Sequence, residues 1–206
     1  MAFLDHTLGI MTHPDSEWLR IRRDKHDAHR VYFSHVPFLA LIPVASAFIG
    51  MTQVGWSVAG SEPVYLTLAS ALALSIATYI GMLVGVCLLG EFITWMAKTY
   101  GVTGADKSRH YEGFALAVYV TTPLFLAGVS HLYPMLWLNV AVFMAAGCYA
   151  VYLLYQGIPI LMDIPKERGF LYASAVVMVG LVLIVATAAA SVIVWSSALG
   201  PVFSGG

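Results

Sequence analysis

Charged residues are scarce in this sequence. Lys, Arg, Asp and Glu together make up 10% of its 206 residues, whereas hydrophobic residues make up 60%. Soluble domains carry about 25% charged residues, so the composition excludes an ordinary soluble domain and indicates a membrane protein. Ten basic residues against eleven acidic ones give a net charge of -1. Without a basic excess, we expect no nucleic-acid partner.

Cysteine is also rare. Cys87 and Cys148 both lie in apolar runs, where they are expected to be reduced thiols that pack as small apolar groups, with no disulfide framework. The N-terminal stretch MAFLDHTLGIM lacks a basic region, and Asp5 and His6 interrupt its apolar residues. A cleavable signal peptide is therefore not expected.

Long apolar runs are what the sequence has in abundance. Five of them reach the roughly 20 residues that a helix needs to cross a bilayer. They predict an all-α polytopic membrane protein: a bundle of five transmembrane helices over residues 36–206, preceded by a short cytoplasmic helical segment over residues 1–35. The five runs are Val36 to Val54, Val64 to Gly90, Gly113 to Ser130, Pro134 to Gln156 and Leu171 to Trp195.

Basic residues are absent from alternate loops. All ten precede the first run or lie in the loops after the second and fourth runs, and the remaining loops and the C-terminal tail contain none. Basic residues near the ends of spans stay on the cytoplasmic side. This distribution predicts a cytoplasmic N-terminus, a C-terminus on the opposite side and an odd number of spans.

The N-terminal segment contains THPDSEWLRIRRD, which predicts a helix start with Pro14 in the first turn. Thr12 and Asp15 fit a capping box with aspartate in place of glutamate. With Trp18, the preceding apolar residues predict an interfacial amphipathic segment on the anionic inner leaflet; a solvated basic segment that only sets topology is the alternative. Those apolar residues are Phe3, Leu4, Leu8 and Met11.

A proline, Pro123, lies inside the third run, in AVYVTTPLFLAG. One interpretation is a packing kink in which Thr121, Thr122 or neighbouring helices satisfy the freed carbonyls. The others are a hinge in a moving transporter helix and a broken helix that lines a binding site. We expect the kink.

Five spans, a cytosolic N-terminal segment, YVTTP in the third span and YQG at the end of the fourth together resemble the Yip family of membrane proteins, which carry the Ypt/Rab-interacting-protein domain. Tyr119 and Pro123 keep the tyrosine-to-proline spacing of a eukaryotic third-span motif. Val118 replaces its glycine, and a second eukaryotic motif, Asp-Leu-Tyr-Gly-Pro, is absent. The chain is therefore more similar to the small bacterial branch, over nearly its whole length. That resemblance implies the fold and the bacterial inner membrane, and little about activity. In that membrane, the distribution of basic residues predicts a periplasmic C-terminus.

Glu91 is a possible intramembrane polar site, at the end of the second run. A charged group deep in lipid is by default a functional hypothesis, such as a proton relay or a cation site. Counting along the helix instead places Glu91 at the headgroups. We therefore expect an interfacial or ion-paired glutamate.

The histidines of the basic side are weak candidates for a metal site. His26 and His29 are three residues apart and share a helical face, and His35 follows near the membrane. Imidazole and carboxylate ligands suit zinc, nickel or iron. No close-spaced set of ligands is complete, so no metal and no cofactor are expected.

Gly81 and Gly85 form a small-xxx-small pattern that permits close helix contact. Contact within one chain is expected, and a homo-oligomer is left open.

The stretch YQGIPILMDIPKERG lies at the end of the fourth run and begins with Tyr155. Gly157 and Pro159 are expected to interrupt the fourth helix there, so that Ile158 to Met162 dips into the interface. This loop is either a membrane-hugging connector or a surface on which a partner docks.

No phosphate loop, nucleophile elbow or paired carboxylates occur in the sequence, so no catalytic residue is assigned and an enzyme is not expected. The sequence predicts a non-enzymatic, membrane-organising protein that interacts with anionic lipid headgroups or with an undefined protein partner. The alternative hypothesis is a small transporter or channel for a cation or small solute.

Overall fold

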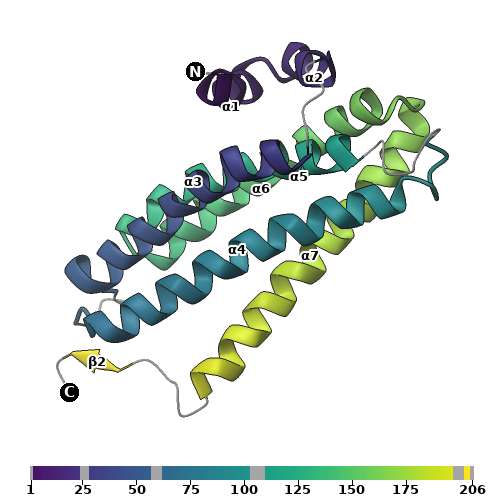
Figure 1. Ribbon diagram of the computed structural model, residues 1–206. Coiled ribbons are helices and arrows are strands. Elements are labelled where there is room, and N and C mark those ends of the chain that lie inside the picture. Colours follow the sequence, from purple (N-terminus) through teal and green to yellow (C-terminus); the bar gives the residue numbers. More distant parts are fainter. Residues whose placement is uncertain (1, 24–27, 57–61, 103–109, 197–201, 205–206) are drawn as a thin grey trace.

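The computed structural model describes residues 2–23, 28–56, 62–102, 110–196 and 202–204 (Figure 1). Within these ranges the chain is almost entirely helical, with two short strands. The elements are α1 (Ala2–Thr12), α2 (Pro14–Arg23), α3 (Ala28–Ile49), the π-helical turn η1 (Gly50–Val54), β1 (Tyr65–Leu66), α4 (Leu68–Met96), α5 (His110–Ala127), the 3-10 turn η3 (Gly128–Leu132), α6 (Leu136–Met162), α7 (Lys166–Ser196) and β2 (Phe203–Ser204).

Five helices in the described ranges are long and apolar enough to cross a membrane. The predicted all-α polytopic architecture is confirmed. Four of the five helices begin several residues before the predicted apolar run or end several residues after it, because a helix continues past the hydrocarbon edge into the headgroup region. The spans are Arg30–Val54, Leu68–Met96, His110–Leu132, Leu136–Met162 and Lys166–Ala186.

Helix α5 is the core of the bundle. Its most apolar stretch is 67% buried, against 11% for those of α4 and α6, because α3, α4 and α6 all pack against α5. Helix α7 packs on α6 and α4 and diverges from α4 along its length (Figure 1). The outer helices thus present long apolar faces to lipid, and α5 makes the contacts within the protein.

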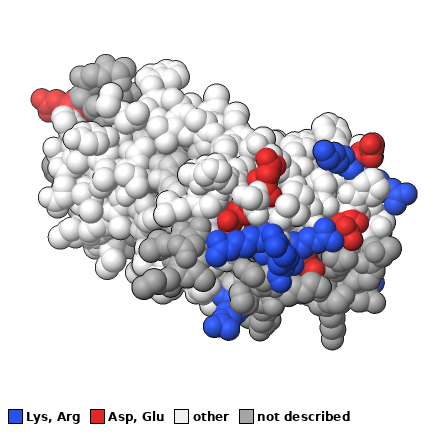
Figure 2. All heavy atoms as spheres, turned by 90° about the horizontal axis from the view of Figure 1, so that it is seen from above, with Lys and Arg blue, Asp and Glu red and all other residues white. Residues whose placement is uncertain are grey.

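The described Lys and Arg residues gather at one end of the molecule, which we call the basic end (Figure 2). They belong to α2, to the start of α3, to the turn after α4, which contains Lys98, and to the start of α7. At the opposite end, β1 pairs with β2 in an antiparallel ladder, with Leu66 opposite Phe203. The described part of the C-terminal segment therefore closes over the start of α4.

Prolines lie inside three of the spanning helices without breaking them. Helix α3 contains Pro37 and Pro43, α5 contains Pro123, and α6 contains Pro159. The predicted interruption at Gly157 and Pro159 is therefore wrong, since α6 continues to Met162. What ends α6 is Asp163, whose left-handed backbone (φ 55°) no longer follows the helix.

Helices α1 and α2 form a compact N-terminal head, residues 2–23, that packs on α5 and α6. The predicted start of α2 at Pro14 is confirmed. The predicted capping box is wrong: Thr12 ends α1, and its hydroxyl donates to the carbonyl of Leu8 at 2.9 Å. Helix α3 begins at Ala28, so the division of the chain at residue 35 falls inside this helix.

Candidate functional site

The junction between the head and the bundle is the most elaborate feature of the described residues, and it is built around one close contact. Trp18 of α2 is fully buried. A Cβ atom at Gly157 of α6 would lie 2.8 Å from the Trp18 ring and 2.8 Å from Leu116 Cδ2. Only glycine leaves room for the indole here, so Gly157 is a socket for Trp18.

A buried ion pair lies beside this socket. His6 Nδ1 of α1 pairs with Glu17 Oε1 of α2, and their side chains are 7% and 8% exposed. Burial of a charged group is costly unless it is paired. The pair therefore holds the two head helices in one arrangement.

Tyr119 of α5 lies where the head meets two spans. Its ring is 6.1 Å from the His6 ring, 6.3 Å from Trp18 and 5.2 Å from His35 of α3, each edge to face. His35 Nδ1 donates to the carbonyl of Val31 at 3.0 Å, which leaves Nε2 to accept from the Tyr119 hydroxyl at 3.3 Å. Tyr119 thus joins the head to α3 and α5.

Four further polar contacts fasten the head to the bundle. Tyr149 of α6 donates to the carbonyls of Ile10 and Met11 at 3.0 and 3.1 Å, and Tyr111 of α5 donates to that of Ile21 at 3.0 Å. At the basic end, Arg22 pairs with Asp163 across 2.9 Å, two exposed groups whose ion pair contributes at most about 1 kcal/mol.

The prediction that Trp18 helps an amphipathic segment lie on the leaflet is wrong for this side chain, because Trp18 faces the protein. The exposed side of the head carries other apolar residues: Leu8 is 63% exposed and Leu19 is 48% exposed.

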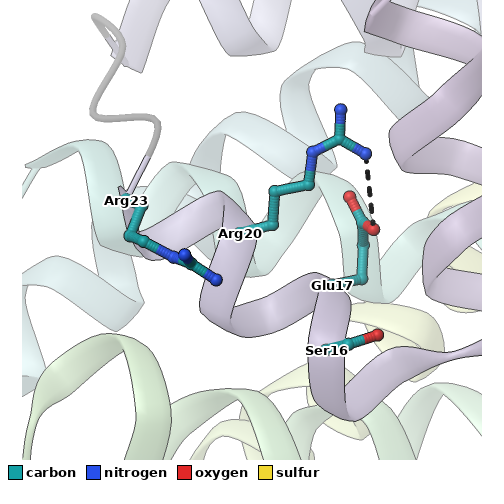
Figure 3. A pocket seen from close by; sticks show the side chains of 4 residues that line it. All are labelled: Ser16, Glu17, Arg20 and Arg23. Atoms are coloured by element: carbon teal, nitrogen blue, oxygen red, sulfur yellow. Dashed lines mark ion pairs between the residues drawn. The ribbon is translucent and has the colours of Figure 1, made fainter.

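A hollow of about 520 Å³ opens on the exposed side of α2 (Figure 3). It is lined by Ser16, Glu17, Arg20 and Arg23. Arg20 Nη1 lies 4.0 Å from Glu17 Oε2, and Arg23 Nε donates to the carbonyl of Leu19 at 3.3 Å. The hollow presents two guanidinium groups, which favour an anion.

Pro123 is buried within a continuous α5. Thr121 donates to the carbonyl of Ala117 at 2.7 Å, and Thr122 donates to that of Val118 at 3.0 Å. Pro123 has no N–H, so the carbonyl of Tyr119 lacks its helical hydrogen bond. The threonine hydroxyls bond the two carbonyls just before it, those of Ala117 and Val118. They are therefore not bonded to the freed carbonyl of Tyr119 that the kink interpretation assigned to them, and the continuous α5 is not a broken helix.

The remaining motif residues of α6 serve packing. The Tyr155 hydroxyl is 2.8 Å from that of Ser174 in α7. Pro159 fills the space that Gly169 leaves open. Ile158 and Met162, expected to dip into the membrane interface, are fully buried.

Glu91 lies at the basic end of α4 with its side chain 53% exposed, and His110 Nε2 is 3.7 Å from its carboxylate. The contact with His110 fits the expected ion-paired glutamate at the end of α4.

The three weak metal candidates do not meet in the described residues. His26 and the side chain of His29 lie outside the described part of the chain, and His35 is engaged by Val31 and Tyr119. Across the described residues, no group of three or more His, Cys, Asp or Glu side chains is placed to hold a metal ion.

Gly81 and Gly85 face away from the rest of the described chain. A Cβ atom at either position would meet nothing within 4 Å among the described residues, so the expected close contact within one chain is not made there. Helix α4 instead approaches α5 at Gly90, where a Cβ atom would lie 3.1 Å from the Phe114 ring.

Comparison with known proteins places this architecture in a family. The profile of the Yip1 domain matches residues 8–187. The chain belongs to the Yip1 domain family. The inner membrane protein YohC of Escherichia coli strain K12 is 38% identical over 192 residues, which cover 93% of this chain and 96% of that protein. YohC of the O6:H1 strain CFT073 matches to the same extent.

No solved structure matches the chain. The Yip1 match begins at Leu8, inside α1, so the domain includes most of the head. Together with the five spans, these relatives identify a Yip-type, multi-pass protein of the inner membrane, and the resemblance inferred from YVTTP and YQG is confirmed.

Sequence reasoning missed His6, Glu17 and Trp18. One signal was available: α2 is polar apart from Trp18, Leu19 and Ile21, and Trp18 and Ile21 share a face at a spacing of three residues. The second signal was Gly157, because a glycine in an apolar run can mark a place where another side chain packs closely against the helix. Nothing in the sequence showed that these two features meet.

Proposed function

We propose that this Yip-type protein is non-enzymatic and organises the inner leaflet of the membrane by presenting its head to anionic lipid headgroups. The observation that carries the proposal is the division of α2 into two faces. Glu17, Trp18 and Ile21 are buried in the junction, while the opposite face exposes Leu19 next to arginine side chains.

The orientation forms part of this proposal. The head and the basic end are placed in the cytoplasm and the β1–β2 end in the periplasm, because every basic residue of the sequence lies on the head's side of the spans and such residues are retained in the cytoplasm.

We expect a reporter fused to the C-terminus to show periplasmic activity: alkaline phosphatase active and green fluorescent protein dark. A reporter fused to the N-terminus should give the reverse pattern. A fluorescent C-terminal fusion would contradict the orientation.

A photo-crosslinking residue placed at Leu19 tests the lipid contact in cells. We expect it to capture phospholipid, and acidic phospholipid in excess of its share of the membrane. Trp137, 81% exposed at the start of α6, is the matched control at the other end of the bundle and should capture lipids without this excess. Equal enrichment at both positions would contradict the proposal.

A small transporter is the second candidate, and the contact of His35 in α3 with Tyr119 in α5 favours it, since buried polar groups among spans often mark pathways. Proteoliposomes decide between the two. Flux of a cation or small solute that is lost in Tyr119→Phe and kept in Tyr133→Phe, an exposed tyrosine, would favour transport; equal and negligible flux in all three proteins favours the lipid-organising role.

A further inference from the structure

We propose that the hollow on α2 binds the phosphate group of an anionic phospholipid, with Arg20 and Arg23 as the groups that hold it. This assignment rests on the proposed function and names its ligand. Both arginines line the hollow together with the hydroxyl-bearing Ser16 (Figure 3).

The spacing of these residues places them on one side of the helix. Ser16, Arg20 and Arg23 are separated by four and three residues, so their side chains follow one face of α2. The face is available because the opposite one, with Trp18 and Ile21, is buried in the junction.

The depth of the hollow matches that of lipid phosphates. Gly157, against which Trp18 packs, lies about 20 residues beyond the start of α6, a length that crosses the hydrocarbon core. From Trp18, helix α2 runs toward the end of α6, as the contact of Arg22 with Asp163 shows. Arg20 and Arg23 follow Trp18 along α2, so they lie on the side of Gly157 that faces the basic end, where lipid phosphates are expected.

The neighbouring groups fit a lipid with its chains attached. Leu19 and Leu8, both exposed, lie on the outer side of the head and supply apolar contact for acyl chains. The acidic group of the hollow, Glu17, is already paired with His6 and lies 4.0 Å from Arg20. The Glu17 carboxylate thus contacts both His6 and Arg20, while Arg23 uses its Nε for the carbonyl of Leu19 and offers its terminal guanidinium nitrogens to the phosphate. Guanidinium groups bind phosphate oxygens in bidentate geometry.

The test uses the purified full-length protein in a neutral detergent, with lipid retention followed by native mass spectrometry. It compares phosphatidylglycerol with phosphatidylcholine of the same acyl chains. Arg20→Gln/Arg23→Gln is expected to weaken phosphatidylglycerol binding about tenfold to thirtyfold, since each basic group near an anionic surface contributes about one kcal/mol. The control, Lys166→Gln/Arg168→Gln, removes two exposed charges of the same end outside the hollow and should bind like the unmodified protein.

Each other result overturns the assignment. Unchanged binding by the arginine variant, equal losses in both variants, or equal retention of both lipids would exclude an anionic phospholipid site on α2. Displacement of phosphatidylglycerol by millimolar inorganic phosphate would assign the hollow to soluble phosphate instead. Arg20→Lys/Arg23→Lys, which keeps the charge, should retain part of the affinity and separates loss of charge from misfolding. If the arginine variant is unaffected while the Leu19 crosslinks persist, the site fails and the lipid-organising function stands.

Discussion

Replacing Gly157 by leucine is expected to release the head from the bundle. A Cβ atom alone would lie 2.8 Å from the Trp18 ring and 2.8 Å from Leu116 Cδ2, and both side chains are fully buried. Expelling a buried indole costs about 3–5 kcal/mol. Amide hydrogen exchange of residues 2–23 should therefore accelerate by two orders of magnitude or more.

The matched control is Gly147→Leu on the same helix. A Cβ atom at Gly147 meets nothing within 4 Å among the described residues, so the added side chain should face lipid and leave exchange in the head unchanged. Slow exchange of the head in both variants would show that Trp18 and Gly157 do not hold it. Fast exchange in both would point to a general effect of enlarging α6.

Replacing Glu17 by leucine is expected to destabilise the head by about 3 kcal/mol or more, because it leaves His6 buried beside an apolar side chain. The same applies to His6→Leu. The double variant should recover most of the loss, since replacing both partners of a buried polar pair by apolar groups is nearly neutral. Exchange rates of the head in the three variants measure this coupling.

Asp15→Leu is the control for this cycle, because Asp15 is an exposed carboxylate of the same helix and its replacement should change the head's stability by no more than about 0.5 kcal/mol. Additive effects of the two single changes would contradict the ion pair. They would show instead that each side chain contributes only through its own packing.

The five spans could be predicted from the sequence because length and apolarity are local properties. The 20-residue requirement predicted the five helices, and the loops that interrupt the apolar runs separated them. The error at Gly157 and Pro159 arose because these residues usually end a helix in water. Here the last turns of α6 are covered by α2, and burial of Ile158, Leu161 and Met162 offsets the hydrogen bond lost at Pro159.

The junction could not be predicted, for a different physical reason. Lipid and protein interior are both apolar, so hydropathy along a spanning helix does not tell which face meets protein. Tyr119 was singled out only as a family marker. Its contacts with His6 and His35 depend on segments 113 and 84 residues away in the chain, and no local pattern reports such distances.

That separation also orders the assembly of the protein. The head precedes its binding surface on α5 and α6 in the chain, and this surface extends to Asp163, about 140 residues after the head ends. At roughly 5–20 residues per second, the head waits several seconds to half a minute after its own synthesis before its socket exists. Docking of the head must therefore wait until the fourth span has been synthesised. A docked head therefore requires that the third and fourth spans have been inserted and have packed together.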